Sequence, residues 1–252
     1  MIMGGPAHSS EDSATDDGLD VFPGVDEFYE YRGEPGADDA PPIWIPVQQG
    51  DVFRGVRVPG IDPPDAEDTL AMVFMHPCVM RKGAVLADRI TVFKVSQETT
   101  KDRPFERFAG NYSAIPLPDL LGQGRGVHLG SFQSVGTVAG QSLDRADRVM
   151  TMTKEGRLFL QQRAVHHFTR HVPPLHDLRN GTRGVEREVE LLTDWCEAAC
   201  DSKGETAVMV AEAEKEFDEY LSSEGRRERL HDDNSTNEIV AETHREFKIR
   251  YP

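Results

Sequence analysis

The fold is decided by the stretch Gly50–Ser96, which reads GDVFRGVRVPGIDPPDAEDTLAMVFMHPCVMRKGAVLADRITVFKVS. It contains three apolar runs of the β type, at residues 51–58, 70–75 and 90–95, with turn-forming residues between them. The first run alternates with the period of a strand, and the second is nearly continuous, as in a strand buried on both faces. Short strands separated by turns predict the first part of a small β-barrel.

The chain after this stretch continues in the same manner as far as residue 152. Four more short strands are predicted, at residues 112–115, 127–129, 131–138 and 147–152. The segment Ile43–Ile45 follows two prolines and is predicted to be a strand or an anchor onto the barrel. We therefore expect a β-barrel domain over residues 43–152.

From Thr153 onward the apolar residues recur with a helical period, and Thr153 itself has the side chain of an N-cap. Leu158, Val165 and Phe168 fall near one face of this helix, and Pro173 ends it. Further helices are predicted after Thr182, from residue 204 to 221, and over residues 239–249 unless that end is loose. The expected fold class is α+β, with a helical extension over residues 153–252 behind the barrel.

The net charge of −16 is divided unevenly along the chain. Residues 1–40 hold eleven acidic residues and one arginine, residues 41–172 have a net charge of +3, and residues 173–252 have a net charge of −9. The segment 1–42 has few large apolar residues, so we predict a disordered acidic arm. The acidity of the whole chain argues against strong nucleic-acid binding. This objection does not apply to the barrel alone, because its net charge is mildly positive.

The composition also bears on the cellular compartment. No apolar run approaches the roughly 20 residues that a membrane-spanning helix needs, and the N-terminus lacks the basic and apolar regions of a signal peptide. The three cysteines cannot all pair in a disulfide framework. We expect a reduced cytoplasmic protein without a membrane partner.

The strand layout resembles that of the MazF/PemK family of toxin endoribonucleases, which are SH3-like barrels. Gly50–Val52, Ala71–Phe74 and Ile90–Ser96 stand where that family has its first three strands. The resemblance implies metal-independent RNA cleavage by an arginine before the second strand and a threonine or serine closing the third. Ser96 fits the second of these positions, whereas Thr69 stands where the arginine is expected.

A phosphorane needs a cation close to the scissile phosphate. Arg54, Arg57 or Arg81 could supply it, provided that the loops bring one of them to Ser96. Without such a rearrangement the resemblance implies a barrel of this type that does not cleave RNA.

His76-Pro77-Cys78 is the most unusual tripeptide of the chain. A cysteine beside a histidine and the basic pair Arg81-Lys82 could be a nucleophile with a lowered pKa. The alternative is that Cys78 fills one end of the barrel as a small apolar residue.

A zinc site is the other chemical hypothesis. His167 and His171 lie four residues apart on one predicted helix, and Cys196 and Cys200 lie four apart on the next. Two such pairs on facing helices would supply four ligands for tetrahedral zinc. The alternative is that these residues form a packing face beside Trp195, and no cofactor is then expected.

No phosphate-binding loop, dinucleotide fingerprint or hydrolase elbow occurs in the chain. Our leading hypothesis is a non-enzymatic binding or regulatory module of a mobile-element, phage or defence-type system. Its barrel would engage a protein or nucleic-acid partner. The alternatives are a metal-independent endoribonuclease and a structural accessory subunit, and the oligomeric state is left open.

Overall fold

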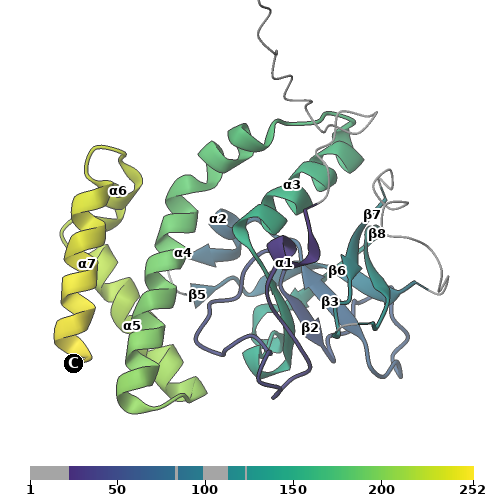
Figure 1. Ribbon diagram of the computed structural model, residues 1–252, viewed down its shortest axis with the longest axis horizontal. Helices are drawn as coiled ribbons and strands as arrows, with labels where there is room; N and C mark the ends of the chain where they lie inside the picture. Colours follow the sequence, from purple (N-terminus) through teal and green to yellow (C-terminus); the bar gives the residue numbers. More distant parts are fainter. Residues whose placement is uncertain (1–22, 83–84, 99–112, 123) are drawn as a thin grey trace, which may run out of the picture.

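A curled antiparallel sheet and a group of C-terminal helices form the protein, with one long helix between them (Figure 1). The computed structural model describes residues 23–82, 85–98, 113–122 and 124–252. The sheet consists of β1 (Tyr29–Arg32), β2 (Val52–Arg54), β3 (Leu70–Val73), β6 (Arg89–Gln97), β7 (Ala114–Pro118), β8 (Val127–Ala139) and β9 (Arg148–Met152). The predicted combination of a barrel-like sheet and a helical C-terminal part is confirmed.

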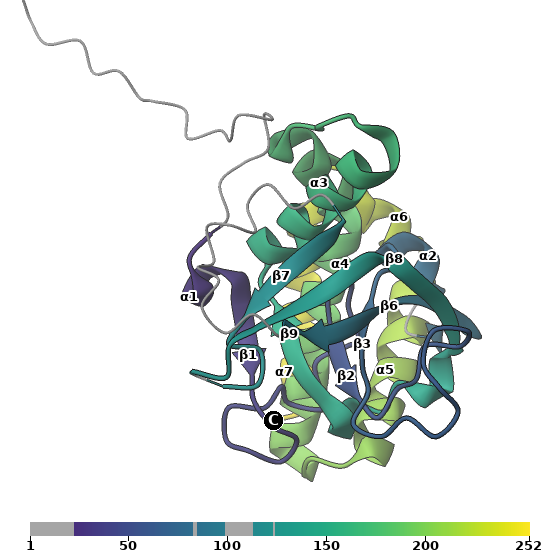
Figure 2. The same cartoon turned by 90° about the vertical axis from the view of Figure 1, so that its right-hand side faces the viewer.

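The strands follow the order β1-β9-β2-β3-β6-β8-β7, and every pair is antiparallel. A small second sheet, β4 (Arg81–Lys82) with β5 (Val85–Leu86), follows the short helix α2 (Pro77–Met80). Two 3-10 turns, η2 (Gly140–Ser142) and η3 (Arg145–Asp147), connect β8 to β9. The sheet therefore curls into a half-barrel (Figure 2).

The strands predicted at residues 127–129 and 131–138 are in fact one long strand, β8. Gly130, which the sequence suggested as a turn, pairs instead with Val95 on one side and Ile115 on the other. A Cβ atom at this position would lie 2.6 Å from Cε of Met72. Glycine is therefore needed here for close packing inside the half-barrel rather than for a turn.

Successive side chains of a strand point to opposite faces of the sheet, and here both faces are apolar. The inner face packs against helix α3 (Lys154–Thr169) and includes Val52, Met72 and Phe93. The outer face includes Phe53 and Val73, and it is covered by loop residues. Both faces are buried, which explains why the run at residues 70–75 is almost continuously apolar.

The N-terminal boundary differs from the prediction of a disordered arm over residues 1–42. Helix α1 (Val25–Phe28) and strand β1 lie inside that segment, and β1 pairs with β9. Phe28 is fully buried in the core of the half-barrel. Phe28 and Tyr29, two of the aromatic residues among the acids of this segment, are therefore core residues, whereas residues 1–22 lie outside the described part of the chain.

The two edge strands of the sheet, β1 and β7, meet through side chains. The hydroxyl of Tyr29 donates to the carbonyl of Pro118 over 2.9 Å, and Arg32 donates to the carbonyl of Asp119 over 3.1 Å. Burial raises the pKa of Tyr29 well above its usual value. These contacts close the half-barrel without a backbone ladder between its edges.

Helix α3 belongs to the core of the half-barrel, although the predicted domain boundary places it in the extension. The predicted N-cap is confirmed, because the side chain of Thr153 accepts a hydrogen bond from the Gly156 backbone. Gly156 also allows α1 to lie against α3, since a Cβ atom there would stand 2.5 Å from the Phe28 carbonyl oxygen. Phe159 and Leu160 then fill the inner face of the sheet.

The remaining helices form a second core around Trp195. They are α4 (Leu175–Lys203), α5 (Ala207–Ser222), α6 (Arg226–His231) and α7 (Thr236–Arg250). Helix α4 begins earlier than the predicted start after Thr182, directly behind Pro174, and it runs between the half-barrel and the other three helices (Figure 1). Trp44, from the segment before the barrel, packs against this second core, so the predicted anchor at Ile43–Ile45 joins the two parts.

A buried ion pair holds this anchor in place. The guanidinium of Arg148 lies 2.8 Å from the carboxylate of Asp51, and both side chains are fully buried. The same guanidinium donates to the carbonyls of Pro42, Ile45 and Pro46. One residue of β9 therefore fixes the start of β2 and the segment that leads into it.

We expect the substitution Asp51→Asn to lower the free energy of unfolding by about 3–5 kcal/mol, because it leaves the buried Arg148 charge unpaired. Urea unfolding followed by circular dichroism measures the change. Asp65→Asn, at an exposed position of the 59–68 loop, is the matched control. A loss at Asp51 as small as that of the control would show that the ion pair does not hold the structure together.

Candidate functional site

A groove lies where the half-barrel meets helices α3 and α4. We call it the α3–α4 groove, and its volume is about 430 Å³. Its lining is mainly apolar and comes from the barrel and from both helices: Gln49, Phe74, His76, Gln161, Ala164, Val165, Phe168, Thr169, Asp177, Leu178, Gly181 and Thr182. Residues more than 130 positions apart in the sequence therefore share one surface.

The floor of the groove is fixed by a short chain of amide hydrogen bonds. Gln161 on α3 donates to the side-chain oxygen of Gln49 over 2.7 Å, and Gln49 donates to the carbonyl of Phe74 over 2.7 Å. Both glutamines are buried. Because their polar groups satisfy each other, the floor presents little unpaired polarity to a ligand.

Two phenylalanines give the groove its apolar character. Phe74 stacks on the core residue Phe93 with a centroid distance of 4.1 Å. Phe168, near the end of α3, has its ring 6.1 Å from that of Phe74 and is 56% exposed. The sequence placed Phe168 with Leu158 on one helix face, but only Leu158 is buried. An aromatic ring left in water at the rim of an apolar groove is typical of a binding surface.

His76 lies at one side of this groove and contacts Cys78. Nδ1 of His76 accepts a hydrogen bond from the Cys78 backbone N–H over 3.3 Å and lies 2.8 Å from Sγ of Cys78. Since a backbone N–H can only donate, Nδ1 carries no proton and can accept the thiol proton. Burial lowers the pKa of His76, which favours the neutral form of the ring. The two residues form the contact that a thiol nucleophile needs with its base.

Cys78 does not fill the end of the barrel, as the alternative hypothesis had it. It is exposed at the start of α2 and borders a second cavity of about 190 Å³ between α2, α4 and α6. Val185, Val189 and Leu192 of α4 form its apolar wall. In the described residues no carboxylate is hydrogen-bonded to the His76 ring, so the pair lacks the orienting acid of a catalytic triad.

The residues suggested by the toxin-family resemblance are not brought together. Ser96 lies on the outer face of β6, whereas Arg54 follows Val52 and Leu70 on the inner face. Arg54 is paired with Glu34 and Asp68. A serine and an arginine on opposite faces of one sheet cannot act on the same phosphate.

The other two arginines are also engaged by the protein itself. Arg57 donates to the carbonyl of Pro64 in the exposed loop. Arg81 is almost completely buried, donates to the carbonyl of Val47 over 2.7 Å and faces Glu214 of α5. Burial lowers its pKa to about 10. Arg81 therefore ties the barrel to the helical part.

The four residues of the proposed zinc site lie in two different environments. The ring of His167 packs against Phe132 of the half-barrel, with a centroid distance of 5.5 Å. His171 is exposed beyond the end of α3. Cys196 is buried in the core around Trp195, where burial raises its pKa to about 12, and Cys200 is also buried. The described residues contain no group of three or more ligands suited to a metal ion.

The sequence did not point to Gln49, Phe74 or Gln161 as site residues. Gln49 and Phe74 flank strands, and Gln161 lies in a helix. In the sequence they therefore look like ordinary residues of those elements, and only their proximity in the structure marks them as parts of one site. The one signal in the sequence was Pro173-Pro174, which lies between the end of α3 at Thr169 and the start of α4 at Leu175.

No protein-family model matches the sequence, and no curated protein matches it. None of the helices within residues 23–82, 85–98, 113–122 and 124–252 has the length and apolar character required to span a bilayer.

The thiol of Cys78 should react with iodoacetamide in the native protein well before Cys196 and Cys200, because those two are buried and Cys78 is exposed beside a base. Mass spectrometry of tryptic peptides identifies the labelled residue. His76→Gln should slow the labelling of Cys78, since the proton acceptor is lost. Equal rates in the variant and the unaltered protein would exclude His76 as the base.

Proposed function

We propose that this protein is a non-enzymatic binding module that accommodates an apolar segment of a partner protein in the α3–α4 groove. The observation that carries the proposal is the exposed ring of Phe168 above an apolar cavity of about 430 Å³. A volume of this size fits one or two large side chains of a partner. The partner's backbone and flanking residues would then cover Phe168. A small ligand confined to the cavity would leave that ring exposed to water.

The charges of the half-barrel favour a protein over a nucleic acid. Lys94 is paired with Asp62, Arg54 with Glu34, and Arg148 with Asp51. Arg145, in the turn before β9, is held by Glu214. Cations that are already neutralised by carboxylates release few counterions from a phosphate backbone, so they contribute little to nucleic-acid affinity.

The strand order supports assigning the half-barrel to the SH3-like class, as the sequence suggested. Strands β2, β3, β6 and β8 form a meander, and the last strand, β9, returns to pair with β2. The 3-10 turns η2 and η3 lead into this returning strand. Barrels of this type serve many functions, so the function is argued from the groove and not from the fold.

A photo-crosslinking residue in place of Phe168 should give one discrete adduct in an extract of the cells that make the protein. The adduct should be degraded by protease and resist ribonuclease. The matched control carries the same crosslinker in place of Val208, which is 68% exposed on α5, away from the groove. A second substitution, Val165→Asp, should abolish the adduct at position 168 because it places a charge in the apolar cavity. Identical adducts at positions 168 and 208, or an adduct that survives Val165→Asp, would rule out the groove as the docking site.

The ribonuclease alternative is tested with labelled single-stranded RNA in the presence of a chelator. We expect intact and unshifted RNA, since Ser96 and Arg54 lie on opposite faces of the sheet. Cleavage that is lost in Ser96→Ala would establish the nuclease instead. A shifted but intact band would identify a nucleic acid as the partner.

A further inference from the structure

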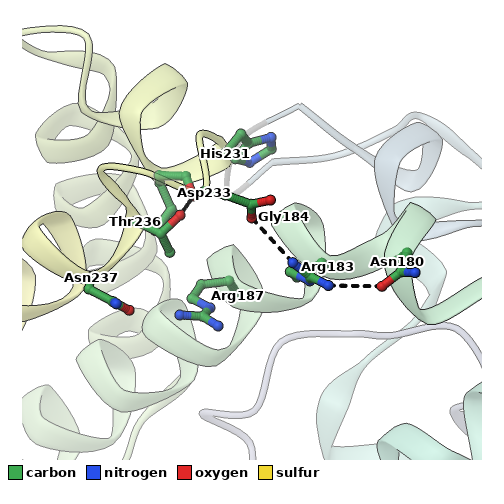
Figure 3. A pocket seen from close by; sticks show the side chains of 9 residues that line it. Asn180, Arg183, Gly184, Arg187, His231, Asp233, Thr236 and Asn237 are labelled. Atoms are coloured by element: carbon green, nitrogen blue, oxygen red, sulfur yellow. Dashed lines mark hydrogen bonds and ion pairs between the residues drawn. The ribbon is translucent and has the colours of Figure 1, made fainter. Parts of the chain in front are cut away.

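A polar cavity of about 500 Å³ lies between α4 and the pair α6–α7, on the side of α4 away from the α3–α4 groove. Asn180, Arg183, Gly184 and Arg187 line it from α4, at the spacing that places side chains on one helix face. The opposite wall is formed by Leu230, His231, Asp233, Thr236 and Asn237. Figure 3 shows these side chains around the opening.

The two arginines of the cavity differ in their hydrogen bonds and ion pairs. Arg183 donates to the side chain of Asn180 over 2.8 Å and pairs with Asp233 over 3.3 Å. Arg187, one turn further along α4, makes no hydrogen bond or ion pair with any described residue, although its side chain is partly buried. In Figure 3 it extends from α4 toward the wall that carries Thr236 and Asn237. A partly buried guanidinium that lacks a carboxylate partner is available to an anion.

Two further features make the cavity suitable for an anion. Thr236 is the first residue of α7, a helix of 15 residues, and no side chain caps the N-terminal N–H groups of this helix. The N–H groups of Thr236 and Glu238 already donate to the carbonyls of Asp232 and Ser235, so it is the helix dipole that favours negative charge at this end. The ring of His231 closes one side against α4 and packs closely on Gly184, where a Cβ atom would lie 3.1 Å from the imidazole.

We propose that this cavity binds a small molecule that carries a phosphate group. Its charge balance is positive, with two arginines against the carboxylate of Asp233, in a chain whose net charge is −16. Two oxygens of a phosphate can each accept a hydrogen bond from one of two N–H groups of a guanidinium, and the unpaired guanidinium of Arg187 can supply both donors. The volume exceeds that of phosphate alone, so the remainder of the ligand lies beside Asn180 and Asn237, whose amides donate and accept hydrogen bonds. This site is separate from the α3–α4 groove and does not rest on the proposed function.

Isothermal titration calorimetry at low ionic strength tests the proposal with three probes: inorganic phosphate, pyrophosphate and adenosine monophosphate. Saturable binding is expected, and a tighter complex with the nucleotide than with inorganic phosphate would identify a ligand larger than the free ion. The substitution Arg187→Gln should raise Kd about tenfold or more, since a charge-assisted hydrogen bond is lost. Asp233→Asn should lower Kd, because it removes the competing carboxylate and releases Arg183.

Arg245→Gln is the matched control. It removes an exposed arginine from the middle of α7, at a position that does not line the cavity, and should leave Kd unchanged. Circular dichroism of each variant confirms that the helices are intact. The absence of saturable binding with all three probes would overturn the proposal, as would equal affinities of the Arg187 variant and the control.

Discussion

The structure depends above all on the buried ion pair between Asp51 and Arg148. A buried ion pair is costly unless further hydrogen bonds compensate its desolvation, and here three backbone carbonyls accept from the two terminal nitrogens of Arg148. Those carbonyls belong to the segment that places Trp44 against the helical core. A single residue of the last strand thus links the first central strand of the half-barrel to the position of the helices behind it.

The elements with a regular apolar period could be predicted from the sequence, whereas their boundaries and partners could not. The strands around residues 70–75 and 90–95 and the N-cap at Thr153 are where local chemistry places them. The joining of two predicted strands through Gly130 depends on the space that Met72 needs, which no local pattern reveals. Phe28 and Tyr29 sit among acidic residues, so composition suggested a disordered arm although both are core residues.

The same limit applies to the sites. His76 and Cys78 are adjacent enough in sequence for their contact to be foreseen, and the structure brings Nδ1 and Sγ together. The α3–α4 groove depends on Gln49, Phe74 and Gln161, which come from three separate segments and look ordinary in each. Arg187 is one of several arginines on acidic helices, and it is distinguished by lying partly buried in a cavity without a carboxylate partner among the described residues. Pairing in space, and not residue type, separates a structural arginine such as Arg81 from an available one.

The closure of the half-barrel by Tyr29 and Arg32 has a mechanical consequence. Two side-chain hydrogen bonds act as a latch between the edge strands, while every other junction of the sheet is a backbone ladder. These two side-chain hydrogen bonds can break while the backbone hydrogen bonds between neighbouring strands stay intact. Tension applied before β1 acts first on the hydrogen bonds of Thr153 with Glu27 and Phe28 and next on this latch, before it reaches the central strands.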